Sequence, residues 1–539
     1  MFRYVLLCAS LAAGCILAGK TLFHYFQLES YQFPGYFRTL RRNLPKSFLP
    51  GLLTAVVTSA VMFIALIFIP GKKSILVYII PSVLIIAGGY GIGRFFYEKK
   101  AKKALVYTPR MKRLYVVAAI VFTVIPLLAV ISLGSGTDGN IFEHSVYFIL
   151  IIFPLLLPVW TACAGLLAWP VEKLISELYF RDAQKILKSR SDLIRIGITG
   201  SWGKTSVKFI LGTMLEEKYH TLVTPASFNT PMGVTKVIRT RLEPGHRVFV
   251  AEMGARHVGD IKEMCRLVHP QIGLITSVGP QHLDTFKTVE RVARTKYELI
   301  DALPEDGHAF FSDDNGICRN LYKKTMIHKS ITGLQADSDD VWAEDIVFSE
   351  NGSSFCLCTK EIRLPCITSL LGELNIRNIL LCAAVCLELG MTGEQIARGI
   401  EKIRPVEHRL QLIPSPGGIT VIDDAFNSNI LGAQQAFKVL KEMPGRRILV
   451  TPGMVELGAV EEEMNREFGK SASGCCDTAI LVGRKRSVSI SDGLIDSGFS
   501  KENIIVVSSL AEAEELLKTL ARSGDTVLFE NDLPDNYSE

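Results

Sequence analysis

The sequence of 539 residues has little excess charge of either sign. It contains 59 Lys and Arg against 54 Asp and Glu, a formal net charge of +5 at pH 7. So small an excess excludes the strongly basic surface with which proteins bind nucleic acids. We therefore expect no nucleic-acid partner.

The twelve cysteines lack the spacing of a disulfide framework. Cys382 and Cys386 fall on apolar helix faces, which predicts reduced and buried thiols in a cytosolic domain. Cys356, Cys358 and Cys366 lack the second cysteine pair of a zinc site, so we interpret them as thiols on a short hairpin.

Long hydrophobic runs are present, by contrast, and all lie in the first 170 residues. With 48% hydrophobic residues and a mean hydropathy of +0.27, the chain is more apolar than an ordinary soluble enzyme. Five runs, each near the ~20 residues that cross a bilayer, occupy about 3–19, 48–69, 74–92, 114–133 and 146–168. No run carries the central charge that marks an ion path, which favours an anchor over a transporter.

Charges in the connecting loops predict the orientation of these spans. The 20–47 and 93–113 loops are rich in Lys and Arg, whereas the 134–145 loop contains only Asp138 and Glu143. This pattern places the N-terminus outside and everything after residue 168 in the cytoplasm, although Lys72 and Lys73 fall on the outer side. We thus expect a multi-pass cell-membrane protein with cytoplasmic catalytic domains.

From residue 193 the pattern changes to short β-branched runs that alternate with helical segments, which predicts parallel sheets covered by helices. The expected strands of a first domain are 193–199, 247–252, 272–278 and 309–311. Those of a second, smaller doubly wound domain are 419–425, 446–453, 478–483, 503–509 and 525–530. The predicted organisation is a helical membrane domain (1–170), a linker (171–192), a central α/β domain (193–403) and a C-terminal Rossmann-like α/β domain (404–539).

A glycine-rich segment follows the first of these strands and opens a helix. In Gly200-Ser201-Trp202-Gly203-Lys204-Thr205-Ser206, the glycines allow backbone N–H groups to surround phosphate oxygens. Lys204 supplies a cation, and the Thr205 hydroxyl can bind magnesium. The segment predicts a phosphate-binding loop but not the class of NTPase.

Further motifs follow in a fixed order, although each one alone has an ordinary structural explanation. They contain a carboxylate and a histidine at strand ends, a lysine and two asparagines on helices, and polar groups near the domain junction and beyond: Glu252, His282, Lys296, Asn375, Asn378, Arg409, Asp424 and the segment Gly453–Gly458. Their order and spacing together indicate a common ATP site.

This set of motifs resembles the Mur ligase family, most closely its D-alanyl-D-alanine-adding members, over about residues 193–530. The matching segments are TGSWGKTS, EMG, the turn with His282, GELNIRN, DDAFNSN and PGMVELG. The resemblance implies an ATP-dependent ligase of peptidoglycan synthesis. In such a ligase a carboxylate takes the γ-phosphoryl group of ATP as an acyl phosphate, an amine then attacks, and phosphate leaves.

The resemblance also implies roles for the individual residues. Lys204 and two Mg²⁺ ions would neutralise the phosphates, with Thr205 and Glu252 on one ion, and His282 and a carbamylated Lys296 on the other. Asn375 and Asn378 would contact the nucleotide, and Arg409 and Asp424 would reach ATP when the domains close. Gly200, Ser201, Gly203 and Ser206 would complete the phosphate loop.

The sequence departs from the family pattern in several places. Leu374 replaces a histidine, Phe426 replaces a tyrosine, and the late segment from Gly524 is acidic where the family is basic. The small N-terminal domain that grips a UDP-sugar is missing, and the apolar runs stand in its place. We therefore expect a lipid-linked or membrane-delivered carboxylate substrate, with an amino acid or dipeptide as the amine.

Two other functions stay open. A membrane-bound poly-γ-glutamate-type synthase would share this ligase core. A transport or scaffold protein regulated by ATP is the alternative from another class, and the intact Lys204, Glu252, His282 and Lys296 weigh against it. The sequence predicts no particular oligomeric state.

Overall fold

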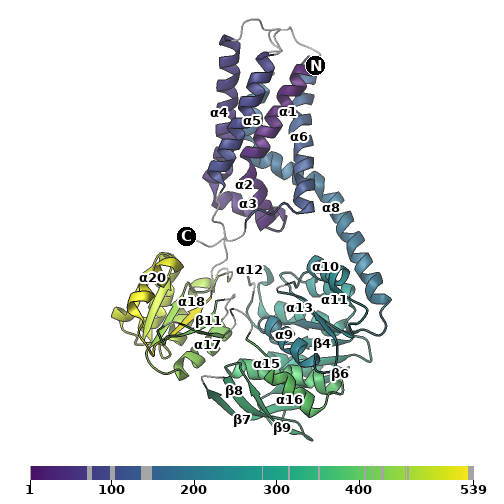
Figure 1. Cartoon of the computed structure of the whole chain (residues 1–539), viewed down its shortest axis with the longest axis vertical. Helices are drawn as coiled ribbons and strands as arrows, with labels where there is room; N and C mark the ends of the chain where they lie inside the picture. The colour runs from purple at the N-terminus through teal and green to yellow at the C-terminus, as the bar shows by residue number, and fades with distance from the viewer. Residues whose placement is uncertain are drawn as a thin grey trace. The chain divides into compact units, whose positions relative to one another are not determined.

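The structure is a computed structural model, and it divides the chain into two compact units, Met1–Glu177 and Leu178–Glu539. The residues that it describes are 2–68, 76–97, 104–134, 148–226, 228–281, 283–313, 316–349, 352–405, 408, 410–415, 417–425, 430–455, 457 and 460–531. As expected, the chain forms a helical region followed by two α/β domains (Figure 1).

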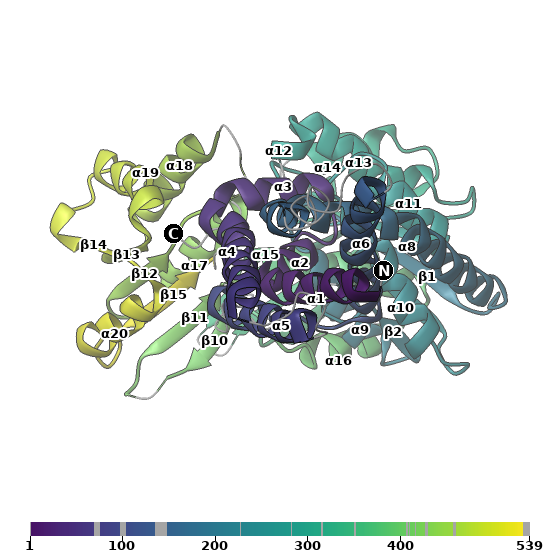
Figure 2. The same ribbon diagram turned by 90° about the horizontal axis from the view of Figure 1, so that it is seen from above.

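The first unit is made of apolar helices. These are α1 (Phe2–Ala18), α2 (Lys20–Leu28), α3 (Phe33–Arg42), α4 (Leu44–Phe68), α5 (Leu76–Phe96), α6 (Pro109–Gly134) and the first part of α8 (Leu157–Lys188). Helix α1 is central, since it packs against both α5 and α6, and α4 packs on α5 (Figures 1 and 2).

Three helices are long and apolar enough to cross a membrane: Leu44–Ala65, Tyr78–Phe96 and Pro109–Ser132. Two bent pairs bring the number to five if each is one span: Tyr4–Ala18 with Lys20–Leu28, bent by 53°, and Phe148–Leu155 with Leu157–Lys188, bent by 76°. The five predicted runs thus correspond to helices, but the first and the last are broken and were not predicted to bend.

Glycines let α1 and α5 approach closely. A side chain at Gly89 would clash with the backbone of Gly14, and one at Gly93 would clash with the carbonyl oxygen of Leu17. Gly91, between them, has open space where a Cβ atom would lie. Small residues four apart on one face commonly allow such contact between membrane helices.

The second unit contains a nine-stranded sheet with the order β2-β3-β1-β4-β5-β6-β7-β8-β9. Its strands are β1 (Ile194–Thr199), β2 (Thr221–Val223), β3 (Val248–Glu252), β4 (Ile272–Ile275), β5 (His308–Ser312), β6 (His328–Gly333), β7 (Val341–Ser349), β8 (Gly352–Cys358) and β9 (Arg363–Thr368). Pairing is parallel from β2 to β7, whereas β7, β8 and β9 are antiparallel. The parallel sheet expected for this domain is therefore confirmed from β2 to β7. The antiparallel edge carries the thiols of Cys356, Cys358 and Cys366 on hairpin strands, as predicted.

Helices cover both faces of this sheet, as the apolar strands require. One face, with Ile196 and Ile198, packs on a core shared with α9 (Lys204–Leu215), α15 (Glu373–Glu388) and α16 (Gly393–Glu401). The other face, with Phe249 and Ala251, packs on α10 (Pro231–Arg241), α11 (Asp260–Val268), α13 (Val289–Asp301) and α14 (Ile317–Lys324). A short helix, α12 (Leu283–Phe286), precedes α13.

A six-stranded sheet forms the C-terminal part, in the order β10-β11-β15-β12-β13-β14. Its strands are β10 (Gln411–Pro414), β11 (Thr420–Asp424), β12 (Arg447–Thr451), β13 (Thr478–Val482), β14 (Ile504–Val507) and β15 (Thr526–Glu530). The five predicted strands are confirmed and parallel, and the unpredicted β10 pairs antiparallel with β11. The helices are α17 (Ile430–Glu442), α18 (Glu461–Ala472), α19 (Arg484–Asp496) and α20 (Leu510–Leu520), with a short 3₁₀ turn at Lys501–Asn503.

Helix α8 continues without a break through residues 171–188, most of the segment predicted to be a linker. Its last turns belong to the second unit, where Phe180, Ala183 and Leu187 are buried in the core beside α10 and α11.

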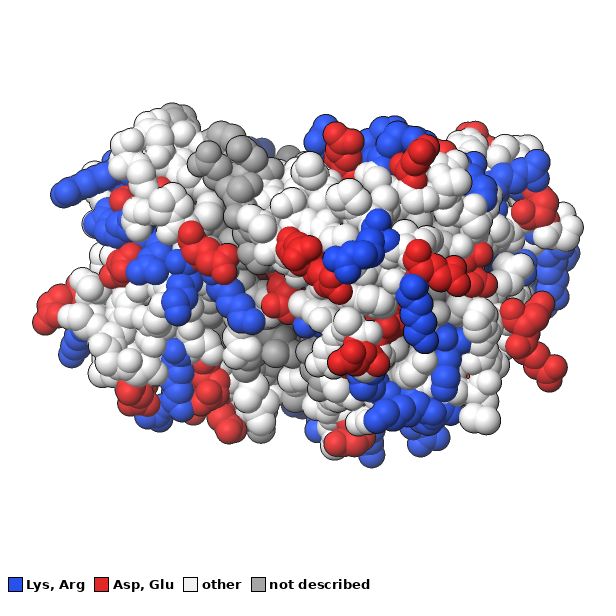
Figure 3. All heavy atoms as spheres, turned by 90° about the horizontal axis from the view of Figure 1, so that it is seen from below, with Lys and Arg blue, Asp and Glu red and all other residues white. Residues whose placement is uncertain are grey.

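Basic and acidic side chains are interspersed over the face shown in Figure 3, in keeping with the small net charge.

Candidate active site

The predicted phosphate loop connects β1 to α9. Gly203 is the residue before the helix and has a φ of 80°, a left-handed conformation that favours glycine. The Lys204 ammonium folds back and donates to the carbonyl oxygens of Gly200 at 2.6 Å and Ser201 at 3.2 Å. The loop thus has the strand–turn–helix setting that phosphate binding requires.

The segment after β4 holds this loop in place. The Trp202 N–H donates to the Ser277 hydroxyl at 2.8 Å, and the Ser277 and Thr276 hydroxyls both donate to the Trp202 carbonyl. The Ser201 N–H donates to the Ser277 carbonyl at 2.9 Å. Thr276 and Ser277 are buried and were not predicted as site residues, and their hydrogen bonds hold the loop in one conformation.

Several side chains of the site contact the carboxylate of Glu252. It ends β3, which pairs with β1, and the residue is 1% exposed. Its carboxylate accepts hydrogen bonds from the Thr205 hydroxyl at 3.2 Å and from the Asn229 amide at 3.1 Å. A hydroxyl and a carboxylate beside a phosphate loop form a donor set that suits Mg²⁺.

Lys208 is the third partner of Glu252, with its ammonium 3.0 Å from the carboxylate. Burial lowers the pKa of Lys208, and the charge of Glu252 opposes that shift. The sequence analysis missed Lys208 and Asn229. Lys208 was detectable, because it lies four residues after Lys204 on α9 and so shares a face with it.

Lys296 lies on α13 and is 1% exposed. Burial, together with the positive charge of Lys204, lowers its pKa well below the usual value. Glu298, two residues further along the chain, accepts from the backbone N–H groups of Gly259 and Lys262, both at 2.9 Å. Among the described residues, no ion pair with Lys296 is found.

The two asparagines are buried at the start of α15. Asn378 lies beside the phosphate loop, since a Cβ atom at Gly203 would be 3.1 Å from its side-chain oxygen. Asn375 donates to the Leu371 carbonyl at 2.8 Å and so fixes the start of its own helix. Thr205 on α9, Glu252 on β3 and Asn378 on α15 are therefore brought together at one loop.

Asp424 lies at the end of β11 in the C-terminal sheet. Its carboxylate accepts from the Leu410 N–H at 3.1 Å, and its carbonyl accepts from the Asn531 N–H at 3.2 Å. The Asn531 amide in turn donates to the Gly453 carbonyl at 2.6 Å, which joins two of the predicted motifs. His282, Arg409, Phe426 and Glu456 lie outside the described residues.

Comparison with known proteins agrees with this geometry. Residues 198–386 match the Mur ligase middle domain, and residues 408–530 match the Mur ligase, glutamate ligase domain. The chain is similar to the UDP-N-acetylmuramoyl-tripeptide--D-alanyl-D-alanine ligase of Escherichia coli, at 31% identity over 61% of this chain and 73% of that protein. The ligase of the same name from Bacillus subtilis is 28% identical, over 62% of this chain and 72% of that protein.

Solved structures show the same fold. MurF from Acinetobacter baumannii superposes with a TM-score of 0.60 at 24% identity, over 66% of this chain and 77% of that chain. MurF ligase from Thermotoga maritima in complex with ADP gives a TM-score of 0.59 at 24% identity, over 66% of this chain and 80% of that chain. With the phosphate loop and its buried carboxylate in place, the chain belongs to the Mur ligase family of ATP-dependent ligases.

Proposed function

We propose that this protein is a membrane-anchored ligase that joins an amine to the carboxylate of a peptidoglycan precursor through an acyl phosphate. The convergence of Thr205, Asn229 and Lys208 on Glu252 beside the phosphate loop carries the proposal. The names of its relatives favour a muramoyl-peptide carboxylate and the dipeptide D-alanyl-D-alanine.

In the proposed reaction a carboxylate oxygen attacks the γ-phosphorus of ATP, and the bond to the β-phosphate oxygen breaks to release ADP. The amine nitrogen then attacks the acyl carbon, phosphate leaves and the nitrogen loses a proton. Two anions must meet in the first step, so positioning and neutralisation of charge dominate catalysis. Lys204 would leave its loop carbonyls to reach the phosphates, and Asn378 would position the nucleotide with Asn375.

Magnesium would supply the remaining positive charge. Thr205 and Glu252 fit one ion, because both offer oxygen atoms at the edge of the phosphate loop. His282 and a carbamylated Lys296 would hold a second ion, and Arg409 and Asp424 would contact the nucleotide. The lowered pKa of Lys296 supports the carbamate, since only an unprotonated amine can attack CO₂.

One contact in the first unit supports an anchor with its basic loops in the cytoplasm. Arg113, at the start of α6, donates two hydrogen bonds to Glu172, at 2.5 and 2.8 Å. Glu172 lies on α8, the helix that continues into the second unit, so the start of α6 and this part of α8 lie at the same end of the first unit. We propose the domain bounds 1–170, 171–192, 193–403 and 404–539 for these parts.

Product analysis tests the function. The full-length protein in nanodiscs would receive ATP, Mg²⁺ and either D-alanyl-D-alanine or glutamate, with UDP-muramoyl-tripeptide or its lipid-linked form as acceptor. We expect mass spectrometry to show a new amide with D-alanyl-D-alanine, formed faster on the lipid-linked acceptor. Repeated addition of glutamate would identify a polyglutamate-type synthase instead.

Cysteine labelling tests the anchor separately. In a cysteine-free background, a cysteine at Arg94 should be protected from an impermeant thiol reagent added to whole cells. A cysteine at Asp138, whose loop lies outside the described residues, should react. The reverse pattern would overturn the orientation without affecting the assignment of the ligase.

A further inference from the structure

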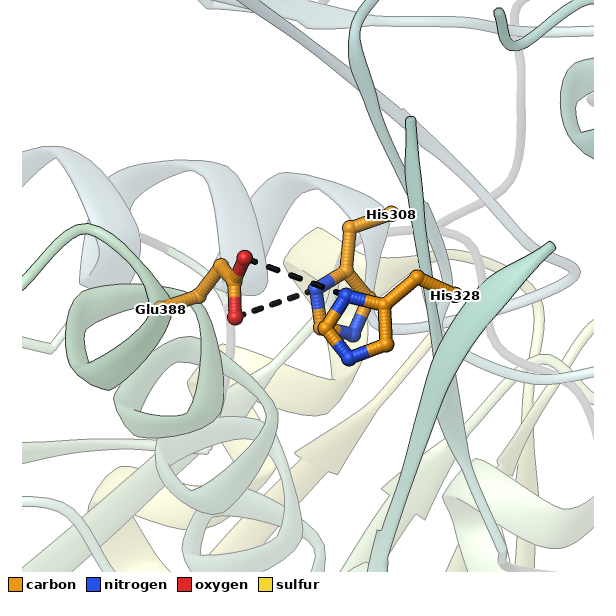
Figure 4. Close-up of side chains that lie close together, drawn as sticks. All are labelled: His308, His328 and Glu388. Carbon is orange, nitrogen blue, oxygen red and sulfur yellow. Dashed lines mark ion pairs between the residues drawn. The ribbon is translucent and has the colours of Figure 1, made fainter. Parts of the chain in front are cut away.

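Two histidines and a glutamate meet at the edge of the central sheet opposite the phosphate loop. His308 and His328 are the first residues of β5 and β6, and they are directly paired in the parallel register. Glu388 is the last residue of α15, the helix that covers this face (Figure 4). Nothing in the proposed reaction uses these side chains.

The three side chains point toward one another. Nδ1 of His308 lies 3.2 Å from one carboxylate oxygen of Glu388, and Nδ1 of His328 lies 4.0 Å from the other (Figure 4). The two imidazole rings overlap, with centroids 3.7 Å apart. Within the described part of the chain, this is the one group of three such residues whose ligand atoms all lie within 4.8 Å of one another.

Nδ1 of His308 is an unsatisfied buried atom. The residue is 4% exposed, and this nitrogen makes no hydrogen bond although the Glu388 oxygen is close. The other ring nitrogen, Nε2, bonds to the Ser330 hydroxyl at 2.9 Å. When Nε2 donates that proton, the Nδ1 lone pair faces a carboxylate oxygen, an arrangement that is repulsive unless a cation lies between them.

We propose that His308, His328 and Glu388 bind a first-row transition-metal dication of the zinc class, with water completing the coordination. Two imidazole nitrogens with one carboxylate suit zinc-like ions, whereas the ligands of Mg²⁺ are mainly oxygen atoms. The Ser330 bond supplies the outer contact that usually orients a ligating histidine. The end of α15 also favours a cation, because helix C-termini are negative.

The geometry requires only a small adjustment. Two metal–ligand bonds of about 2.1 Å span at most about 4.2 Å, so the outermost of the three ligands must move inward. His328 and Glu388 are exposed and can move, whereas His308 is fixed in the core between Phe310 and Ser330.

Helix α15 connects this site to the nucleotide site. Asn378, in its first turns, lies beside the phosphate loop, and its last residue is Glu388. The bound metal would fix the far end of that helix to β5 and β6. Glu388 and Asn378 are separated by ten residues, about 15 Å of helix, so a metal at Glu388 would be too far from the phosphate loop to contact a nucleotide there. The role of the site would therefore be structural.

A second histidine pair in the chain provides a matched control. The rings of His220 and His246 also stack, with centroids 4.2 Å apart. There, however, Nδ1 of His246 accepts from the Glu243 N–H at 2.9 Å. Among the described residues, no carboxylate completes a metal-binding group with this pair.

Zinc titration of the full-length protein tests the proposal. The protein would carry an affinity tag without histidine and would be titrated calorimetrically in buffer that contains Mg²⁺. We expect one zinc per chain, and visible absorption bands of low-symmetry coordination when Co²⁺ replaces zinc. His328→Gln and Glu388→Gln change exposed side chains, and each should weaken zinc binding at least about tenfold, as the loss of even an outer contact does.

His220→Gln should leave the affinity unchanged. The proposal is overturned if the wild-type protein binds no zinc, or if His328→Gln and Glu388→Gln bind it as tightly as His220→Gln. The latter result would indicate an adventitious ion only. Because the test measures the affinity for zinc and not ligase activity, its failure can be distinguished from failure of the proposed ligase function.

Discussion

The ammonium of Lys208 lies 3.0 Å from a carboxylate oxygen of Glu252, and the two side chains are 0% and 2% exposed. Neither charge has water around it, so each depends on the other. The ion pair also orients the carboxylate that we propose as a magnesium ligand. Lys208 is thus a positioning residue for Glu252.

Replacement of Lys208 by methionine should leave Glu252 as an unpaired buried charge. Breaking a buried pair on one side typically costs about 3–5 kcal/mol, so the thermal midpoint of the protein should fall clearly. Arg466→Met is the control, because its ion pair with Asp496 is exposed and should contribute little. Equal midpoints for the two variants would contradict the role of Lys208.

Replacement of Lys204 by alanine should remove the cation that faces the transferred phosphoryl group. Losing one electrostatic contact of this kind lowers turnover by roughly 10²–10³-fold. ATP-dependent phosphate release would measure the loss, while size-exclusion profiles check that the protein is folded. Lys518→Ala, on the exposed surface of α20, should retain full activity. Normal turnover in Lys204→Ala would place the active site elsewhere.

Replacement of Lys296 by alanine should nearly abolish ligation, and short carboxylates should partly restore it. The reason is that a carbamate contributes an anionic oxygen to a metal, and a free carboxylate can fill the vacated position. In the wild-type protein, ¹³C-labelled bicarbonate should give a carbamate NMR signal that is lost in Lys296→Ala. If activity survives the substitution, Lys296 is not a metal ligand.

Lys296 should also affect the dependence of stability on pH when CO₂ is excluded. Its pKa is lower in the folded chain than in the unfolded chain, where it has the usual value of 10.5. Between these two pKa values the unfolded chain binds more protons, so the free energy of unfolding rises with pH across that window and stays low below it. Lys296→Met should flatten this rise. An unchanged slope in thermal unfolding between neutral and alkaline pH would contradict the shift.

Valine at Gly93 should disrupt the packing of α1 on α5, because its side chain would meet the carbonyl of Leu17. Overpacking costs about 1–3 kcal/mol or more where a backbone must move. Gly91→Val is the matched control, since nothing lies within 4 Å of a Cβ atom there. Fluorescence-detected size exclusion in detergent should show aggregation of Gly93→Val alone. Aggregation of both variants would indicate a general effect of valine.

Much of the fold was predictable because it follows from periodicity in the sequence. The strands β1, β3, β4 and β5, and all five parallel strands of the C-terminal sheet, were predicted from β-branched runs. The hairpin of β8 and β9 was predicted from its cysteines, but its place at the antiparallel edge of the central sheet was not. Ser353, Ser354 and Pro365 interrupt the apolar pattern of these two strands. The bend after Ala18 contains no proline, and Gly19 and Lys20, which lie at the bend, were interpreted only as the end of the apolar run.

The site was predictable where a motif encodes a local turn, as in Gly203 to Thr205, and where a strand end carries a lone charge, as in Glu252. It was not predictable where the function of a residue depends on a distant partner. The Ser277 hydroxyl holds the phosphate loop only because it accepts a hydrogen bond from the backbone N–H of Trp202, which is 75 residues away in the sequence. The pairing of His308 with His328 likewise depends on the strand register.

The two edges of the nine-stranded sheet have a consequence for crowding. Edge strands offer unpaired backbone groups to neighbouring molecules, and short strands or prolines reduce that hazard. Here β2 has only three residues, and β9 contains Pro365 and begins with the charged Arg363. Proteins anchored as proposed would share a two-dimensional surface, where local concentrations are high. Such edges would let many copies work side by side without joining their sheets into aggregates.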